Sequence, residues 1–214
     1  MTDEEKTVYA LGLLLQRSLK PFDLSASELE VLKRALSDAA ANKPAINLTE
    51  YRTQIEPLAR ARATRVAARE KASAAEYIAK AAAQPGAVKT PSGLVYVELM
   101  AGTGPSPKAS DTVRVHYRGT LTDGTEFDSS YARNEPAEFP LDGVIPCWTE
   151  GVQKMKVGGK ARLVCPSDLA YGDEGNQVIP GGAALIFEVE LLEIVAGGGP
   201  GGPGAPAPGT QGGI

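Results

Sequence analysis

The sequence predicts an α+β protein, with an all-α domain at the N-terminus and a domain of antiparallel strands at the C-terminus. Apolar residues recur at spacings of three and four in residues 1–84, which is typical of amphipathic helices. In residues 91–195 they alternate with polar residues, as in half-buried strands. Residues 196–214 are rich in Gly and Pro and lack aromatics, which predicts a disordered tail. We therefore expect domains at residues 1–84 and 85–195, followed by this tail.

Two short helices are expected at the start of the N-terminal domain. The first covers about residues 3–19 and ends before Pro21. Its apolar stripe consists of Val8, Leu11, Leu15 and Leu19. The second begins at Ser25, because Ser25 and Glu28 have the spacing of a capping box, in which each side chain binds the backbone N–H of the other residue.

A long third helix is expected from about Thr49 to residue 83. Pro57 lies inside it and should kink it or divide it in two. Beyond Pro57 the segment consists mostly of Ala, Arg, Lys and Glu, which favour helix. Since alanine is its main apolar residue, we expect an exposed stalk that buries little surface against its own domain. A solvated face is expected for its arginines, with an acidic partner as the alternative: Arg60, Arg62, Arg65 and Arg69.

Few large apolar side chains are available to the N-terminal domain, so its core would be marginal in a monomer. Dimerisation through the first two helices would bury their apolar stripes. We therefore expect a homodimer. The alternative is that these helices fold back on the C-terminal domain.

The C-terminal domain is expected to combine strands with one short helix. The helix begins at Pro146, which suits the first helical position because no N–H donor is needed there, and it runs to about Met155. An Asp-Gly pair in residues 122–125 predicts a tight turn. Strands are expected over residues 94–99, 113–118, 161–165 and 184–194.

Composition argues against several classes of function. The 214 residues carry a net charge of −4, so a general positive field for binding nucleic acid is not expected. No run of about 18 apolar residues predicts a transmembrane helix. One histidine, His116, and two cysteines, Cys147 and Cys165, are too few for the ligand cluster of a zinc enzyme, and we expect no metal and no cofactor. For the two cysteines we favour buried free thiols over a disulfide.

Three motifs of the C-terminal domain occur in a specific order and spacing. The first is residues 113–131 (VRVHYRGTLTDGTEFDSSY), and the second is residues 144–151 (VIPCWTEG). The third combines residues 169–172 (LAYG), 179–182 (IPGG) and 185–191 (LIFEVEL). Together they strongly resemble the FKBP family of peptidyl-prolyl cis/trans isomerases over about residues 92–195. The helical half is similar to bacterial two-domain members, the macrophage infectivity potentiator group, which form dimers through their short helices.

The resemblance implies a five-stranded antiparallel half-barrel wrapped around one short helix, with a substrate groove lined by aromatics. It implies catalytic roles for Tyr117, Asp128 and Tyr171, whose hydroxyl would bind a substrate carbonyl. Trp148 would form the floor under the proline ring, and the Ile145 backbone N–H would donate to another carbonyl. The remaining groove residues would be Phe127, Val144, Ile179 and Phe187, with Arg133 supporting Asp128.

The implied activity is rotation of X–Pro bonds in proteins, assisting folding, by a groove that binds the twisted amide. Such rotation breaks no covalent bond, so neither a nucleophile nor a metal is needed. His116 can therefore lie outside the site, and strand alternation turns it away from the face of Tyr117. The alternative is a chaperone or a proline-peptide-binding module with little turnover.

Partners and localisation follow from the same resemblance. The expected partners are proline-containing unfolded or partly folded proteins, and macrolide inhibitors that would occupy the groove. Bacterial two-domain members are usually exported, so we expect the periplasm or cell envelope, with the cytoplasm as the alternative. The first residues lack a signal-peptide core, so an exported form is expected to have lost its signal before Met1.

Overall fold

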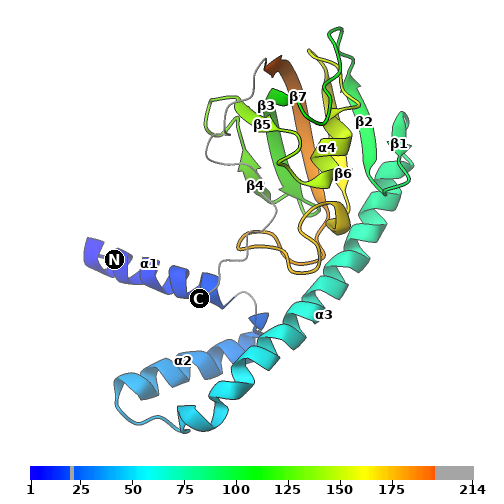
Figure 1. Cartoon of the computed structure of the whole chain (residues 1–214). Coiled ribbons are helices and arrows are strands. Elements are labelled where there is room, and N and C mark those ends of the chain that lie inside the picture. The colour runs from blue at the N-terminus through cyan, green and yellow to red at the C-terminus, as the bar shows by residue number, and fades with distance from the viewer. Residues whose placement is uncertain (20–21, 196–214) are drawn as a thin grey trace. The chain divides into compact units, whose positions relative to one another are not determined.

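The computed structural model describes residues 1–19 and 22–195. The chain divides into two compact units, Met1–Val66 and Ala67–Ile214, and their boundary falls inside the long helix α3 (Leu48–Ala82) (Figure 1). Pro21, expected to end the first helix, and the tail expected at residues 196–214 lie outside the described residues.

The predicted N-terminal helices are present, with α1 at Asp3–Ser18 and α2 at Ala26–Ala40. The capping box is confirmed, because the Glu28 N–H donates to Ser25 Oγ at 3.3 Å and the Ser25 N–H donates to Glu28 Oε2 at 2.8 Å. α3 runs through Pro57 as one helix of 35 residues, so Pro57 does not divide it. A proline removes one helical hydrogen bond, and the turns on either side are long enough to continue without it.

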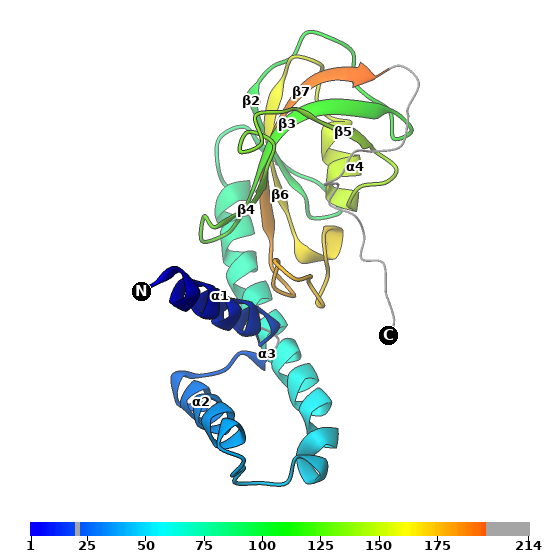
Figure 2. The same ribbon diagram turned by 90° about the vertical axis from the view of Figure 1, so that its left-hand side faces the viewer.

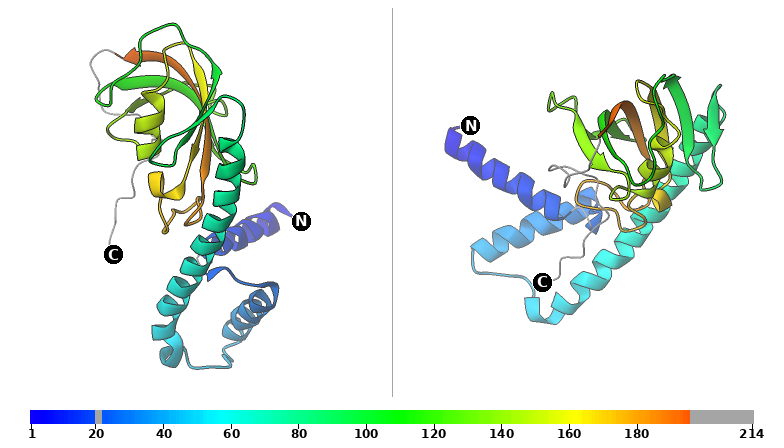
Figure 3. Two further views of the ribbon diagram at one scale, coloured as in Figure 1. Left: turned by 90° about the vertical axis from the view of Figure 1, so that its right-hand side faces the viewer. Right: turned by 45° about the horizontal axis from the view of Figure 1, so that its top comes forward.

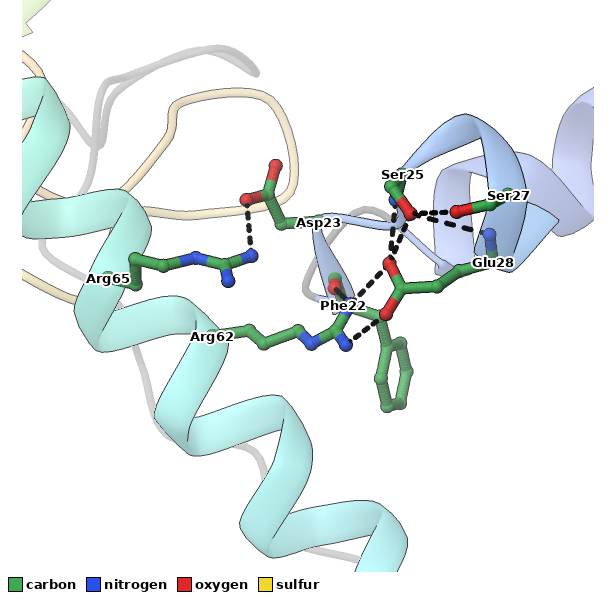
Figure 4. Close-up of polar contacts among 7 residues, drawn as sticks. All are labelled: Phe22, Asp23, Ser25, Ser27, Glu28, Arg62 and Arg65. Carbon is green, nitrogen blue, oxygen red and sulfur yellow. Dashed lines mark hydrogen bonds and ion pairs between the residues drawn. The ribbon is translucent and has the colours of Figure 1, made fainter.

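A polar cluster joins the segment before α2 and its first turn to α3 (Figure 4). The Arg62 guanidinium binds both carboxylate oxygens of Glu28, and Arg62 Nη1 also donates to the Phe22 carbonyl at 2.9 Å. Arg65 Nη2 lies 3.0 Å from Asp23 Oδ2. The Arg62 side chain is only 15% exposed. The expectation of a solvated face is therefore wrong for Arg62, because two acidic residues just before α2 and in its first turn attract this side of α3.

The N-terminal unit buries little apolar surface of its own. None of its described residues has a buried side chain. Large apolar residues that are more than half exposed include Val8, Tyr9, Leu11, Leu14, Val31 and Leu36. A set of this size is unusual for the surface of a monomeric protein.

The C-terminal unit contains one antiparallel sheet in the order β1-β2-β6-β7-β3-β4, with β5 also paired to β3 (Figures 1 and 2). Its centre consists of the two long strands β3 (Thr112–Leu121) and β7 (Leu185–Val195), which are paired along most of their length. On the free side of β3, β4 (Glu126–Ser129) pairs near one end and β5 (Ala137–Pro140) near the other. These two short strands together fill one strand position.

On the free side of β7 lie β6 (Lys160–Cys165) and then β2 (Val95–Met100). The sheet therefore has the five strand positions expected of the half-barrel. The three-residue strand β1 (Ala87–Lys89) extends the β2 edge and was not predicted. The predicted turn at residues 122–125 is confirmed, with the Leu121 N–H donating to the Thr125 carbonyl at 2.9 Å.

Different helices cover the two faces of the sheet (Figure 3). One face contacts α4 (Pro146–Val152), whose Pro146 occupies the first turn as predicted, and the main hydrophobic core lies between them. The other face is covered by the end of α3, where Tyr77, Ile78 and Ala81 contact a second cluster. That cluster is formed by the sheet residues Val95, Val97, Val164 and Ile186.

The expectation of an exposed stalk is therefore wrong for the last part of α3, one face of which is buried against the C-terminal sheet. Ala67, Ala74 and Ala81 are buried there, at intervals of seven residues. A small side chain lets the helix backbone approach its neighbour closely, so an alanine-rich helix can still cover a sheet. None of the described helices is long and apolar enough to cross a membrane.

A disulfide joins α4 to β6. Cys147 and Cys165 are bonded, with their Cα atoms 5.7 Å apart, and both residues are fully buried. The preference for two free thiols was therefore wrong. The pairing depends on how the helix crosses the sheet, and the 18-residue separation does not reveal that geometry.

Candidate active site

Tyr117 on β3, Asp128 on β4 and Arg133 after β4 form a closed hydrogen-bonded triad. The Tyr117 hydroxyl donates to Asp128 Oδ2. Arg133 Nη1 donates to Asp128 Oδ1 at 2.6 Å, and Arg133 Nη2 donates to the Tyr117 oxygen at 2.9 Å. The antiparallel register brings the first two together, because Asp128 is paired with Gly119, two residues along β3 from Tyr117. Each member of the triad holds the other two in place.

The electrostatics of the triad keep the Tyr117 proton in place. Burial, followed by the hydrogen bond to Asp128, raises the pKa of Tyr117 well above its usual range. The hydrogen bonds to Asp128 and then to Tyr117 raise the pKa of Arg133. At neutral pH the triad therefore contains a neutral phenol and a charged guanidinium.

Trp148 lies at the centre of an aromatic cluster. The rings of Tyr117, Phe139 and Phe187 each lie 5.3 Å from its ring, edge to face. Trp148 is fully buried, and its Nε1–H has no conventional acceptor among the described residues. Three nearly perpendicular rings surround it, so the face of an aromatic ring can act as a weak acceptor. The cluster is a buried and mainly apolar aromatic environment, and it shares Tyr117 with the triad.

Gly119 makes room for a further ring of this cluster. A Cβ atom at this position would lie 2.6 Å from Phe127 Cζ and 3.0 Å from Phe187 Cε1. Phe127 instead lies close to the β3 backbone and meets Phe187 edge to face at 5.6 Å. Any larger residue at position 119 would displace Phe127.

Val144 and Ile145 precede α4 and are buried at its start. Ile145 is the N-cap, and its carbonyl accepts hydrogen bonds from the N–H groups of Trp148 at 2.9 Å and Thr149 at 3.2 Å. Among the residues that the structure describes, no acceptor takes the Ile145 N–H. A donor that remains free at the start of a helix can bind a carbonyl of a ligand.

Tyr171 and Ile179 lie in the segment from residue 167 to residue 182, here named the 167–182 loop. Burial, followed by the negative charge of Asp128, raises the pKa of Tyr171 to about 12, so its hydroxyl keeps its proton at neutral pH. Ile179 is buried, and its N–H donates to Asn176 Oδ1 at 2.8 Å. The loop therefore supplies one hydroxyl donor and one apolar side chain.

Comparison with known proteins identifies the family of this chain. A family model described as "FKBP-type peptidyl-prolyl cis-trans isomerase" matches residues 104–192, and one described as "Domain amino terminal to FKBP-type peptidyl-prolyl isomerase" matches residues 4–97. The chain belongs to the FKBP family of peptidyl-prolyl cis/trans isomerases. It is accordingly a peptidyl-prolyl cis/trans isomerase of the FKBP type.

Relatives of this FKBP resemble it over both halves of the chain. The isomerase FkpA of Aeromonas hydrophila is 43% identical over 204 residues, which cover 89% of this chain and 76% of the relative. The 22 kDa FKBP-type isomerase of Escherichia coli K12 is 43% identical over 200 residues, or 91% of this chain and 97% of the relative. The crystal structure of FkpA from Escherichia coli matches with a TM-score of 0.69 at 42% identity, covering 90% of this chain and 97% of that one.

The structure brings most of the predicted site residues of this FKBP into two contacting groups, the triad and the aromatic cluster. Phe139 was missed, although it contacts both Trp148 and Tyr117. It lies in a four-residue strand that follows Pro136 and ends with Pro140, which is too short to show alternation. His116 contacts other partners, stacking on Tyr131 at a centroid distance of 4.7 Å.

Proposed function

We propose that this FKBP isomerises X–Pro bonds by holding the proline against the aromatic cluster beside the Tyr117–Asp128–Arg133 triad. In this proposal Trp148 lies beneath the proline ring, and Phe127, Val144, Ile179 and Phe187 form the walls. The Tyr171 hydroxyl and the Ile145 N–H donate to substrate carbonyls. The observation that carries the proposal is that Tyr117 joins a closed polar triad to a mainly apolar aromatic cluster, because that combination suits a twisted amide.

The physical reason lies in the amide itself. Its rotation barrier is about 18–20 kcal/mol, because resonance is lost midway. The twisted amide is less dipolar than either planar form. Moving it from water to an apolar aromatic surface therefore costs less than moving a planar amide there. A site that binds the twisted form better than both planar forms lowers the barrier, and a millionfold acceleration needs about 8 kcal/mol of this preference. Tyr171 and Ile145 would keep the flanking carbonyls in register while the bond turns.

The test is NMR-detected cis/trans exchange of an Ala-Leu-Pro-Phe peptide with the intact chain and with Asp128→Leu. We expect fast exchange with the former and loss of most of it with the latter. Glu98→Leu is the control, since it also replaces a strand carboxylate by leucine but lies outside the triad, at an exposed position, whereas the Asp128 side chain is only 27% exposed. If Asp128→Leu retains full activity in a folded protein, the proposed site is wrong.

A holding function for unfolded proteins is the second candidate. It is favoured by the exposed apolar residues of α1 and α2, which could bind client segments. A chaperone of this kind would prevent aggregation equally well after Asp128→Leu or Tyr171→Phe. If both variants lose isomerase activity and keep anti-aggregation activity, the two functions reside in different surfaces.

Homodimerisation is proposed through the exposed apolar residues of α1 and α2. Two chains that paired these helices would cover side chains that one chain leaves more than half exposed. Light scattering should therefore give a dimer for the wild type and a monomer for Leu11→Glu with Leu15→Glu. Val88→Glu changes an apolar residue of similar exposure on β1 and should remain dimeric. A monomeric wild type at micromolar concentration would contradict the proposal.

Localisation in the periplasm or cell envelope is supported by the buried disulfide. Such bonds persist in oxidising compartments and are rare in the cytosol. Thiol labelling of the denatured protein from freshly quenched cells distinguishes an exported chain from a cytosolic one. The exported chain resists the label, and the cytosolic chain reacts at both cysteines.

Macrolide inhibitors are proposed to occupy the aromatic cluster around Trp148, so they should compete with the proline peptide.

A further inference from the structure

The second part of α3 contacts the 167–182 loop through a lysine. Lys71 Nζ lies 2.5 Å from Asp173 Oδ1 and 3.4 Å from Asp168 Oδ1. The two carboxylates lie on either side of Tyr171 in the sequence, so one ammonium group on the helix binds both ends of the segment that carries this tyrosine. Hydrogen bonds to Asp173 raise the pKa of Lys71, which keeps it charged.

The backbone of the same helix touches the other end of the loop. A Cβ atom at Gly182 would lie 2.3 Å from the Ala67 carbonyl oxygen and 3.0 Å from its Cα. Gly182 also has φ +77°, a conformation that glycine adopts readily. Ala67 is buried at this contact. Ala67 and Lys71 are four residues apart, so they lie on one face of α3.

The loop between these contacts is tightly folded. The Gly182 N–H donates to the Gly172 carbonyl at 2.8 Å, and the Gly175 N–H donates to the Tyr171 carbonyl at 3.1 Å. A Cβ atom at Gly181 would lie 2.0 Å from the Asp173 carbonyl oxygen. Because the loop is internally braced, fixing it at Asp173 and Gly182 also fixes Tyr171.

We infer that Lys71 is a positioning residue for isomerisation, which holds the 167–182 loop so that the Tyr171 hydroxyl meets the substrate. This inference rests on the proposed role of Tyr171. The Lys71, Asp168 and Asp173 side chains are 41%, 79% and 63% exposed, so the ion pairs are open to solvent and are screened by salt. The position of the loop, and with it substrate affinity, therefore depends on ionic strength.

The test compares Lys71→Gln with Lys80→Gln in the intact chain. Lys80 is the matched control, because it also forms an exposed ion pair, with Glu76 of its own helix at 2.7 Å. For Lys71→Gln we expect kcat/KM for the proline peptide to fall about two- to fivefold, as the loss of an exposed ion pair allows. The fall should appear in KM, since the loop contributes to binding. Lys80→Gln should match the wild type.

Two further readouts separate a positioning role from a merely structural one. They are the salt dependence of kcat/KM and the activity of a variant that keeps the charge. Raising the salt concentration from about 0.02 to 0.5 M should lower wild-type kcat/KM toward that of Lys71→Gln and leave the variant unchanged. Lys71→Arg keeps the charge and should restore most of the activity. Wild-type kinetics for Lys71→Gln at low salt would overturn the inference.

Tyr171→Phe separates this inference from the proposed site. If Tyr171→Phe is impaired while Lys71→Gln is not, the site stands and the positioning role fails. If Tyr171→Phe keeps wild-type activity, both the proposed site and the positioning role fail.

A second pair of variants tests the backbone contact between α3 and the loop. Gly182→Ala should raise KM more than Gly158→Ala, because Gly158 has a similar φ of +83° but open space around the added methyl group. Equal effects of the two would show that no helix contact is involved.

Discussion

The Tyr117 hydroxyl donates a hydrogen bond to the Asp128 carboxylate, and Arg133 binds the oxygens of both. Three side chains from β3, β4 and the following turn therefore depend on one another at the edge of the aromatic cluster. Removing any one of them leaves the other two bonded to each other, but each of the two loses one hydrogen-bond partner at a partly buried polar atom, which is more costly than the bond itself.

Tyr117→Phe is expected to lower the free energy of unfolding by about 1–3 kcal/mol, because Asp128 loses a donor and Arg133 loses an acceptor. The variant should also lose isomerase activity. Tyr131→Phe is the control, since its hydroxyl likewise donates to a carboxylate, Glu190 at 3.1 Å, but at an exposed position. Urea unfolding should separate them, and equal losses would contradict the importance of the triad.

Reduction of the Cys147–Cys165 disulfide is expected to lower the free energy of unfolding by about 3 kcal/mol, because the cross-link restricts a loop of 18 residues in the unfolded chain. The measurement is urea unfolding with and without a strong reductant at full equilibrium. Cys147→Ala with Cys165→Ala should unfold at the same urea concentration in both conditions. An unchanged midpoint for the reduced wild type would contradict this prediction.

Glu28 should titrate far below an ordinary glutamate. The hydrogen bond from Arg62, followed by that from the Ser25 N–H, lowers the pKa of Glu28 to about 2. The folded pKa lies below the unfolded one, so the contact stabilises the fold above pH 4.5 and this contribution is lost as the pH falls toward 2. Carbon-detected NMR should show the low midpoint, and Arg62→Met should raise it toward 4.5. Arg65→Met, which removes the contact to Asp23, should leave it low.

Tyr171 should titrate about two pH units above an ordinary tyrosine, with a pKa of about 12. The folded pKa is raised, so this group stabilises the fold below pH 10 and the contribution is lost as the pH rises through 12. Tyrosinate absorbance after a rapid pH jump measures the folded protein before it unfolds. The signal lost in Tyr171→Phe should have its midpoint near pH 12, and a midpoint near 10 would mean that the hydroxyl is not shielded.

Local signals in the sequence predicted most of the fold. The Ser25–Glu28 capping box, the Asp-Gly turn and Pro146 at the start of α4 each act within a few residues, so short patterns were enough. The contact of α3 with the sheet was missed because its buried positions are alanines, which give almost no hydrophobic contrast along the helix. The disulfide was missed because it depends on the crossing of α4 and β6.

The candidate site was anticipated through the order of its motifs rather than through any single residue. Tyr117, Asp128 and Arg133 are 11 and 5 residues apart in sequence, and only the β3–β4 register brings them together. Phe139 gave no comparable signal. The contact of Lys71 with Asp173 joins residues about 100 positions apart, and no pattern in the chain indicates it.

The buried alanines of α3 also determine where a fragment that contains the catalytic site should begin. A fragment that starts at residue 85 keeps every residue of the triad and the aromatic cluster but uncovers Val95, Val97 and Ile186 on the opposite face. Any change in its stability or activity would have two causes, the loss of the N-terminal unit and the exposure of the second hydrophobic cluster. A fragment that starts at Ala67 retains this cover, so the difference between the two fragments isolates what the end of the helix contributes to the enzyme.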